Sequence, residues 1–377
     1  MPDATPSLYV HIPFCRSRCP YCSFASGGYE ANLADAYLDA LSRELSQRGV
    51  FDSISPSSIF IGGGTPSCLS LKQCEKLLRQ LRFSSPVPEI TCEINPDSAS
   101  REKLRLLRDS GVNRCSFGVQ TFSEKGLRLL GRRHNAAKAR KAVETAVLLG
   151  FSEISLDLMF AWPGQDKKSF LQDLKQAVSL GITHLSCYQL TLEEDSRFYN
   201  DLSKNNIHEI NADHNREFWD TAEQVLREDG FEHYETSNYC RPGHVCRHNV
   251  AIWKGGNYLG IGSAAHSHLE NRRFANVSDA EKYIAALTED RLPEVFSETL
   301  NPEAKAKECA IFWLRLFEGV EMEEFKTRTG FDFRELYAGT LPGLLERGWL
   351  EFSEGGKRIR VGEKHQPILD SILVELV

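Results

Sequence analysis

The chain has 377 residues, of which 41% are hydrophobic and 26% are charged, and its formal net charge is −7. A chain of this size and composition buries a substantial core, and we expect one large domain with a smaller one beside it. The acidic balance, without a cluster of Lys and Arg, argues against nucleic acid as a partner. No apolar window approaches the ~18 residues of a membrane-spanning helix. We therefore expect no transmembrane segment, which leaves open only peripheral contact with a membrane.

Strands and helices alternate along the first two thirds of the chain. Ser7–Ile12 reads as a buried strand, and the spacing of apolar residues over 33–45 predicts an amphipathic helix. Six such units imply a parallel sheet with right-handed crossovers, so we predict an α/β fold whose core is a partial (β/α)6 barrel. The further strands, each with helical periodicity after it, are predicted at 58–61, 90–94, 114–119, 153–159 and 184–190.

Three cysteines, Cys15, Cys19 and Cys22, lie on one predicted loop directly after the first strand. Such crowding rarely suits disulfides, whereas thiolates that converge on an iron–sulfur core need it. A closed structural zinc site takes four ligands, and no fourth Cys or His follows closely. Three ligands leave one iron of a [4Fe–4S] cube free to bind an outside molecule. The alternative is that the three thiols are simply small buried side chains.

The remaining cysteines are interpreted differently from these three, because they are scattered along the chain. The beginning of the sequence lacks the basic and then apolar pattern of an export signal, so we expect a cytoplasmic, reducing environment. Those that lie in apolar strand or helix patterns are interpreted as small core residues. They are Cys68, Cys74, Cys92, Cys115, Cys187 and Cys309.

The CxxxCxxC spacing after a strand resembles the cluster motif of the radical S-adenosylmethionine superfamily. The flanking sequences HIPFC (11–15) and CPYCSF (19–24) resemble its coproporphyrinogen oxidase-like branch. By this resemblance Cys15, Cys19 and Cys22 ligate a [4Fe–4S] cluster, and its open iron is chelated by S-adenosylmethionine.

Unusual residues follow several of the predicted strands, at the edge where parallel barrels bind ligands. The run GGGTP (62–66) allows positive φ and close backbone approach, although alone it could be a plain tight turn. Glu93 puts a carboxylate at the barrel mouth, or is a solvated loop acid. The resemblance implies S-adenosylmethionine contacts at Tyr9, Gly63, Gly64, Thr65, Glu93, Gln120, Arg132 and Asp157.

A second informative stretch runs from 234 to 268. Cys240, His244, Cys246 and His248 could hold zinc, although they lack the usual paired CxxC or HxxxH elements. The run to Trp253 more sharply resembles HemW-type haem chaperones, whose relatives carry His-Asn-x-x-Tyr-Trp here.

By that resemblance His248 is the haem candidate, with Trp253 as a ring platform, and His266 is a second one. Ile252 stands where the relatives have Tyr. The plain alternative is that His248 is a satisfied buried histidine.

From Asn301 the pattern changes to helices followed by a β-ribbon, which resembles a winged-helix-like α+β domain. Its acidic composition argues against DNA binding. We expect three parts: a radical S-adenosylmethionine core at 1–240, a connecting region with the haem-site candidate at 241–300, and a C-terminal domain at 301–377.

The resemblance implies a haem chaperone that binds haem and passes it to an acceptor protein. The rivals are an oxygen-independent coproporphyrinogen III oxidase and a radical S-adenosylmethionine methyltransferase. The oxidases typically carry a further cysteine where this chain has Phe24, and an extension before the first strand that is missing here. We therefore expect no oxidase activity, while the sequence leaves open whether the protein is an enzyme at all.

Overall fold

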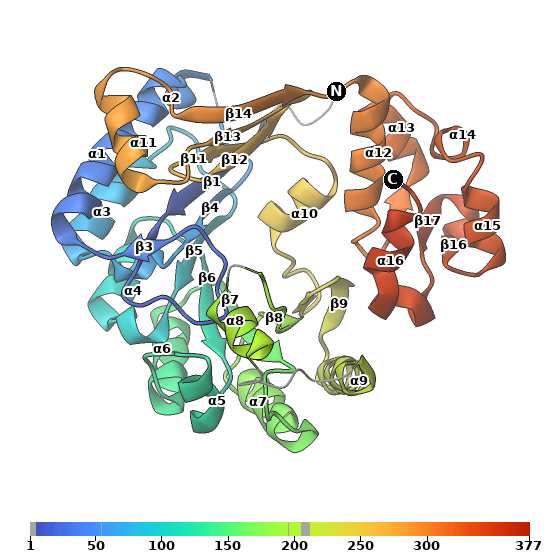
Figure 1. Ribbon diagram of the computed structural model, residues 1–377, viewed down its shortest axis with the longest axis horizontal. Coiled ribbons are helices and arrows are strands. Elements are labelled where there is room, and N and C mark those ends of the chain that lie inside the picture. The colour runs from blue at the N-terminus through green and yellow to red at the C-terminus, as the bar shows by residue number, and fades with distance from the viewer. Residues whose placement is uncertain (1–4, 54, 195, 205–211) are drawn as a thin grey trace.

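The computed structural model describes residues 5–53, 55–194, 196–204 and 212–377. Within these residues a twelve-stranded sheet forms the main body, and a smaller α+β unit lies beside it (Figure 1). The order across this sheet is β14-β13-β12-β11-β1-β4-β5-β6-β7-β8-β10-β9. Neighbours from β11 through β1 to β8 run parallel, and those outside this block run antiparallel.

The six predicted strands are confirmed, and they stand side by side as the parallel core of the sheet. Helices follow them as crossovers and cover the outer face, so the predicted partial (β/α)6 barrel is confirmed as well (Figure 1). These strands are β1 (Ser7–Ile12), β4 (Ile59–Gly63), β5 (Ile90–Ile94), β6 (Arg114–Gln120), β7 (Glu153–Phe160) and β8 (His184–Gln189). The helices of this part are α1 (Ala31–Gln47), α2 (Val50–Ser53), α3 (Leu71–Gln80), α4 (Arg101–Asp109), α5 (Glu124–Leu129), α6 (Ala136–Leu149), α7 (Lys167–Ser179), α8 (Arg197–Ser203) and α9 (Ala212–Glu228), with short 3₁₀ turns at Pro66–Cys68 and Pro96–Ser98.

Side-chain caps explain where several of these helices begin. Ser70 and Gln73 form a reciprocal capping box at the start of α3, in which each side chain bonds the other's backbone N–H. Ser100, Asn135 and Asp166 each accept a hydrogen bond from the backbone three residues on, at α4, α6 and α7.

The segment from 241 to 300, expected to be a connecting region, extends the sheet beyond one flank of the barrel's first strand rather than only linking two domains. β11 pairs with β1 in parallel and continues the sheet beyond it, and β12 to β14 follow as an antiparallel meander. The further elements before residue 300 are β9 (Glu232–Glu235), β10 (Asn238–Cys240), α10 (Arg247–Trp253), β11 (Tyr258–Ile261), β12 (His266–Leu269), β13 (Arg272–Asn276), α11 (Ala280–Thr288) and β14 (Glu294–Thr299).

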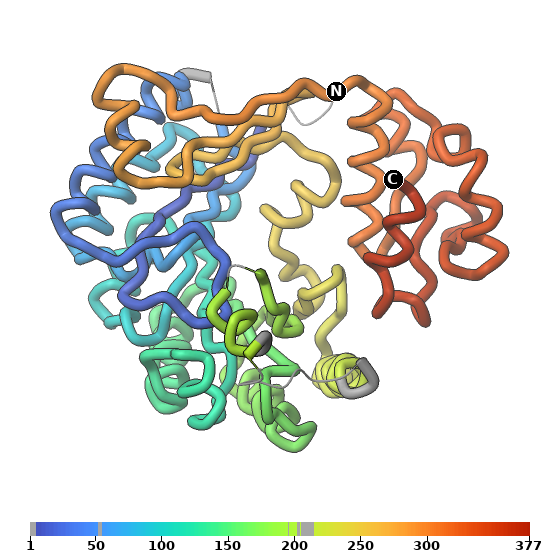
Figure 2. The backbone as a smooth tube through the Cα atoms, in the orientation of Figure 1, coloured from blue at the N-terminus to red at the C-terminus, as the bar shows by residue number. Residues whose placement is uncertain are grey.

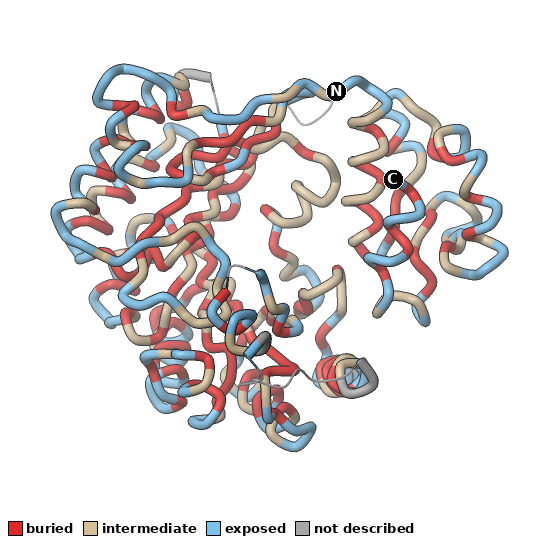
Figure 3. The backbone as a smooth tube through the Cα atoms, in the orientation of Figure 1, coloured by how far each residue is buried: buried red, intermediate tan, exposed pale blue. Residues whose placement is uncertain are grey.

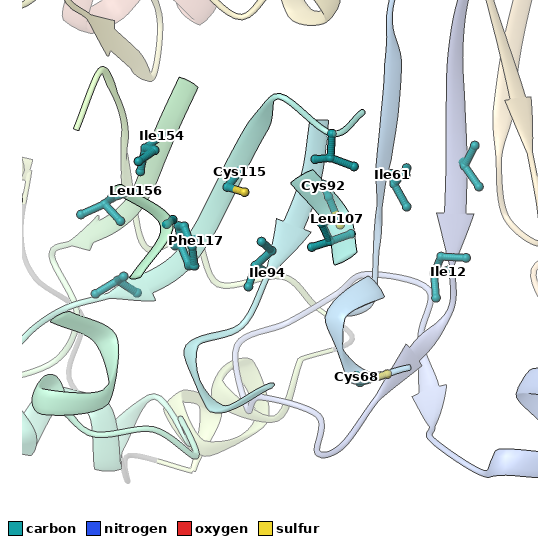
Figure 4. Packing of buried hydrophobic residues seen from close by; sticks show 14 of the residues in the cluster. Ile12, Ile61, Cys68, Cys92, Ile94, Leu107, Cys115, Phe117, Ile154 and Leu156 are labelled. Atoms are coloured by element: carbon teal, nitrogen blue, oxygen red, sulfur yellow. The ribbon is translucent and has the colours of Figure 1, made fainter. Parts of the chain in front are cut away.

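The main core lies between the sheet and its outer helices. On β1, Leu8, Val10 and Ile12 are fully buried in this layer, whereas the alternate residues Tyr9 and His11 face the inside of the barrel. Figure 3 shows the same contrast, with buried strands inside and exposed helix surfaces outside. Figure 4 shows part of the layer, including three of the cysteines interpreted as core residues; all six of them are buried, so that interpretation is confirmed. The residues labelled there are Ile12, Ile61, Cys68, Cys92, Ile94, Leu107, Cys115, Phe117, Ile154 and Leu156.

The C-terminal part has a core of its own, centred on buried Trp313, Phe325 and Phe333. Its strands form a small antiparallel sheet in the order β15-β17-β16. Figure 2 shows this part beside the barrel, with α10 between the two. Within the described residues, no helix is both long and apolar enough to cross a membrane. The elements are α12 (Pro302–Trp313), β15 (Val320–Glu321), α13 (Met322–Thr329), α14 (Phe333–Leu336), α15 (Leu341–Glu346), β16 (Leu350–Ser353), β17 (Arg358–Val361) and α16 (Leu369–Val374), with 3₁₀ turns at Glu354–Gly356 and Glu363–Ile368.

Candidate functional site

The cysteine loop is closed by a small parallel ladder between β2 (Phe14–Cys15) and β3 (Gly27–Gly28). This ladder gathers Cys15, Cys19 and Cys22 along one wall of a cavity at the carboxyl ends of the barrel strands. The three thiols are free and half-buried. Burial raises the pKa of Cys22, and the neighbouring thiols Cys19 and Cys15 raise it further, as expected for sulfur atoms held close together.

Most of the residues predicted to contact S-adenosylmethionine line this same cavity, which we call the cluster cavity. Tyr9 does not; it lines an adjoining cavity together with His248, the haem candidate, and this cavity shares Phe24, Gly63 and Glu93 with the first. The predicted residues in the cluster cavity are Gly63, Gly64, Thr65, Glu93, Gln120, Arg132 and Asp157.

The glycine turn is required by close contacts as well as by backbone conformation. Gly63 has a φ of 110°, and a Cβ there would lie 2.7 Å from the His11 ring. A Cβ on Gly64 would lie 2.8 Å from the carbonyl oxygen of Phe14 and 3.1 Å from the sulfur of Cys15. The absence of a side chain at Gly64 therefore lets the turn pack directly against the cysteine loop.

Arg132 connects three walls of the cluster cavity. Its Nη1 lies 3.4 Å from the sulfur of Cys19, and its Nη2 donates to the Asn95 side-chain oxygen at 2.5 Å and to the Gly118 carbonyl at 2.6 Å. The Asn95 amide in turn donates to the Thr65 hydroxyl at 3.1 Å. Asn95 was not predicted to contact a ligand, although it stands two residues after Glu93 in the sequence.

A bulge directs Gln120 into the cluster cavity. The register of β6 against β7 shifts between Gly118 and Gln120. Gln120 has a φ of 69°, in the left-handed backbone region that residues other than glycine seldom adopt. The Tyr188 hydroxyl donates to the Gln120 side-chain oxygen at 2.8 Å. Strained backbone of this kind gathers at functional sites. Tyr188 was also missed, since its only sequence signal is its place near the end of β8.

Two half-buried carboxyls, Glu93 and Asp157, lie in the cluster cavity, and the charge of Asp157 acts on Glu93. Burial raises the pKa of Glu93 to about 8, with the charge of Asp157 adding to the effect and a hydrogen bond from the Gly63 N–H opposing it. Burial also raises the pKa of Asp157 to about 6, against hydrogen bonds from Ser116 and Ser186. A cationic ligand between them would favour the ionised form of both.

Tyr9 holds the cysteine loop through His11. The Nε2–H of His11 donates to the Ala25 carbonyl at 2.8 Å, so its Nδ1 accepts from the Tyr9 hydroxyl at 3.0 Å. Tyr9 thereby fixes the end of the loop that carries the thiols. Its direct contact with S-adenosylmethionine stays a prediction.

The adjoining cavity, which we call the His248 cavity, has a mainly apolar lining and lies inside the barrel against α10. His248 is 3% exposed, and burial lowers its pKa to about 4, so the imidazole is neutral at pH 7. His266 is exposed and also lines this cavity, whereas Trp253 packs against the C-terminal core, near Phe312. The structure therefore separates Trp253 from His248.

Among the described residues, no three His, Cys, Asp or Glu side chains converge on one metal ion. In the stretch considered for zinc, His244 contacts Glu153, Cys246 contacts Glu89 and His248 contacts Ser58, so these side chains do not form a zinc site. An iron–sulfur cube is ligated at separate corners and needs thiolates set around it rather than converging on one ion. The three free thiols on one cavity wall, with a guanidinium beside Cys19, fit that requirement.

Comparison with known proteins agrees with this geometry. Residues 9–177 match the Radical SAM superfamily, and residues 300–360 match the HemN C-terminal domain. The coproporphyrinogen III oxidase (HemN) structure from Escherichia coli superposes with a TM-score of 0.86 at 24% identity, covering 100% of this chain and 91% of that one. At this identity the superposition shows the fold. The fold and the site define a radical S-adenosylmethionine protein.

Similar proteins of known name show which family of radical S-adenosylmethionine proteins the chain belongs to. The chain is 35% identical to "Heme chaperone HemW" of Bacillus subtilis, over 92% of this chain and 93% of that protein. It is 36% identical to "Heme chaperone HemW" of Escherichia coli, over 97% of both. The chain belongs to the HemW family.

Proposed function

We propose that this chain binds haem and passes it to an acceptor protein. The observation that carries the proposal is the pair of adjoining cavities: one gathers three free thiols beneath the glycine turn, and the other is mainly apolar and holds a buried neutral imidazole. The heme chaperones that match 92% and 97% of this chain support the same reading.

In this proposal Cys15, Cys19 and Cys22 hold a [4Fe–4S] cluster, and the glycine turn receives the methionine end of S-adenosylmethionine. When bound, the two together supply one-electron chemistry. Arg132 places its guanidinium 3.4 Å from the Cys19 sulfur, so a positive charge lies beside the proposed cluster position. Glu93 and Asp157 provide the negative charge that a sulfonium and an amino group require.

The remaining predicted cofactor contacts, Thr65 and Gln120, are uncharged, and their proposed role is to orient the ligand. Thr65 is fixed by Asn95, and Gln120 is fixed by Tyr188, so both polar groups are held ready for a ligand. These assignments follow the family motifs residue by residue, and the shared cavity supports them.

In this proposal haem binds in the His248 cavity, which has a volume of about 330 Å³ and is not fully enclosed. This volume is at the small end of small-molecule pockets, so a porphyrin there is only partly covered. Partial cover suits a cargo that must be handed on, because an acceptor can reach the exposed part. A neutral imidazole such as His248 is a common iron ligand.

Phe24 favours this function over the oxidase. It is 64% exposed and lines both cavities, at the position where the oxidases typically carry a further cysteine. Among the described residues, the cluster cavity is lined by no thiol besides the three assigned to the cluster. Phe24 contributes an aromatic face between the cluster and the haem position instead of a proton donor or ligand.

The cytoplasm is the proposed compartment, and haem with its acceptor protein are the proposed partners. All eleven cysteines are unpaired, as in a reducing environment. The net charge of −7 supports the exclusion of nucleic acid.

Titration of the purified protein with haem tests the site. We expect a Soret band that saturates at about one haem per chain, because of the two buried imidazoles that line the cavity only His248 has a ring nitrogen left for iron: both nitrogens of His11 are bonded, to Tyr9 and to Ala25. His248→Ala should weaken binding and shift the band, whereas the matched variant His266→Ala removes an exposed imidazole from the same cavity and should change binding much less. Equal effects of the two variants, or none from His248→Ala, would contradict the assignment.

A further inference from the structure

The buried environment of His248 fixes which of its ring nitrogens carries the hydrogen. Nδ1 lies 2.9 Å from the Ser58 hydroxyl oxygen. That hydroxyl donates its own hydrogen to the Ser7 hydroxyl, 3.0 Å away. A serine hydroxyl has one hydrogen to donate, so toward His248 it accepts. Nδ1 of His248 therefore carries the hydrogen, and Nε2 keeps its lone pair.

This arrangement is the one that metal-bound histidines use. Such a histidine donates its other ring N–H to a protein acceptor, which sets the tautomer and the ring orientation. The Phe60 ring lies beside the imidazole, with centroids 5.1 Å apart and planes inclined by 36°, and limits its rotation. With Nδ1 engaged by Ser58, Nε2 is the nitrogen left for a ligand in the cavity.

The backbone that carries His248 is held separately, by the buried carboxylate of Glu89. Its two oxygens accept from the backbone N–H groups of Arg247 and His248, each at 3.0 Å, and the Cys246 thiol lies 3.6 Å away. Cys246, at the N-cap position of α10, provides no side-chain cap. Since an isolated helix of seven residues is not stable, α10 depends on this contact and on packing.

Glu89 is itself anchored in the barrel. It is 4% exposed, directly precedes β5, and lies 3.9 Å from the buried guanidinium of Arg114. A carboxylate at a helix N-terminus is favourably placed for the helix dipole. The position of α10 is thus set by the end of the barrel opposite to the cysteine loop.

We propose that Ser58 and Glu89 are positioning residues for haem ligation by His248: Ser58 keeps the proton on Nδ1 so that Nε2 can bind iron, and Glu89 fixes the start of α10. The inference rests on the proposed haem function and adds to it residues that touch no haem. Neither residue belongs to the cluster cavity.

Ser58→Ala tests the tautomer directly, and Ser57→Ala is the matched control, since its hydroxyl contacts Ser7 at 3.2 Å and not His248. In haem-free protein labelled with ¹⁵N in its histidine rings, NMR should show His248 protonated on Nδ1 in the wild type and in Ser57→Ala. Ser58→Ala should give a mixture of both tautomers. The His248 signal is identified by its absence from His248→Ala.

Haem titration supplies the second readout. Ser58→Ala should bind haem about 10- to 100-fold more weakly, the usual effect of losing the partner of a metal-bound histidine, with an altered Soret band. Ser57→Ala should match the wild type. An unchanged tautomer together with unchanged affinity in Ser58→Ala, or an equal loss in Ser57→Ala, would overturn the role of Ser58.

Glu89→Gln tests the second half of the inference. The side-chain amide keeps the size of Glu89 but presents only one oxygen to two backbone N–H groups. Hydrogen exchange at the amides of Arg247 and His248 should accelerate, and haem affinity should fall. Unchanged exchange and affinity would refute the role of Glu89. If Glu89→Gln does not fold, the Ser58 measurements still decide the inference.

Different results would contradict the proposed haem site and the positioning roles of Ser58 and Glu89. If His248→Ala leaves haem binding unchanged, the proposed haem site is wrong. If His248→Ala weakens binding while Ser58→Ala and Glu89→Gln do not, the haem site stands and the positioning inference is wrong.

Discussion

Replacing Glu93 by Gln should change how the stability of the ligand-free protein depends on pH. Burial and the charge of Asp157 raise the pKa of Glu93 from its ordinary 4.5 to about 8. Between these two values the folded state holds a proton that the unfolded state has lost. The free energy of unfolding therefore falls as the pH rises through this interval.

The size of the effect follows from the interval. Each pH unit contributes about 1.4 kcal/mol, so the full penalty above pH 8 amounts to about 5 kcal/mol. Glu93→Gln has a neutral amide in place of the carboxyl, so its folded state carries no such penalty at high pH. The variant should be close to the wild type in stability near pH 4 and more stable by up to about this amount near pH 9.

Urea denaturation of the cluster-free protein at a series of pH values, in the presence of a reductant, measures the difference. Glu144→Gln, which removes an exposed carboxylate from α6, is the control. The difference in its free energy of unfolding from that of the wild type should be small over the whole pH series. A difference between Glu93→Gln and the wild type that stays constant from pH 4 to pH 9 would refute the reasoning that burial keeps this carboxyl neutral.

Two further substitutions test the cysteine loop. Cys19→Ala should abolish the broad visible absorption and the content of about four irons per chain obtained by anaerobic reconstitution, and a full cluster in this variant would remove the assignment of the three cysteines. Gly64→Ala should lower cluster occupancy, because its Cβ would lie 2.8 Å from the Phe14 carbonyl and displace the loop at a cost of about 1–3 kcal/mol. Gly28→Ala, where nothing lies within 4 Å of the added Cβ, should reconstitute fully, and iron analysis of the two variants decides the point.

The parallel core of the fold could be predicted because its signals are local. The strands β1, β4, β5, β6, β7 and β8 are short apolar runs, and the helices between them repeat apolar residues at three and four positions. The flank of the sheet could not be predicted in the same way. The sequences of β12 and β13, His-Ser-His-Leu and Arg-Arg-Phe-Ala-Asn, are too polar to read as strands, and they are ordered by pairing with β11 and β14.

In the candidate site, too, local features could be predicted from the sequence and long-range contacts could not. Residues in compact motifs, such as Cys15 and Gly64, could be placed together, because the ends of parallel strands meet at one edge. Contacts between distant segments could not be predicted. Ser58 and His248 are 190 residues apart in the chain, and Glu89 and His248 are 159 apart, so their hydrogen bonds depend on the tertiary fold. Trp253 was expected beside His248, yet the turn of α10 directs it to the C-terminal core.

The most direct test of the account is a paired measurement on one reconstituted sample. One half receives haem, and the other is reduced and given S-adenosylmethionine with coproporphyrinogen III. The account predicts saturation at about one haem per chain, dependent on His248, and no protoporphyrinogen. Repeated turnover of coproporphyrinogen without haem binding would contradict it.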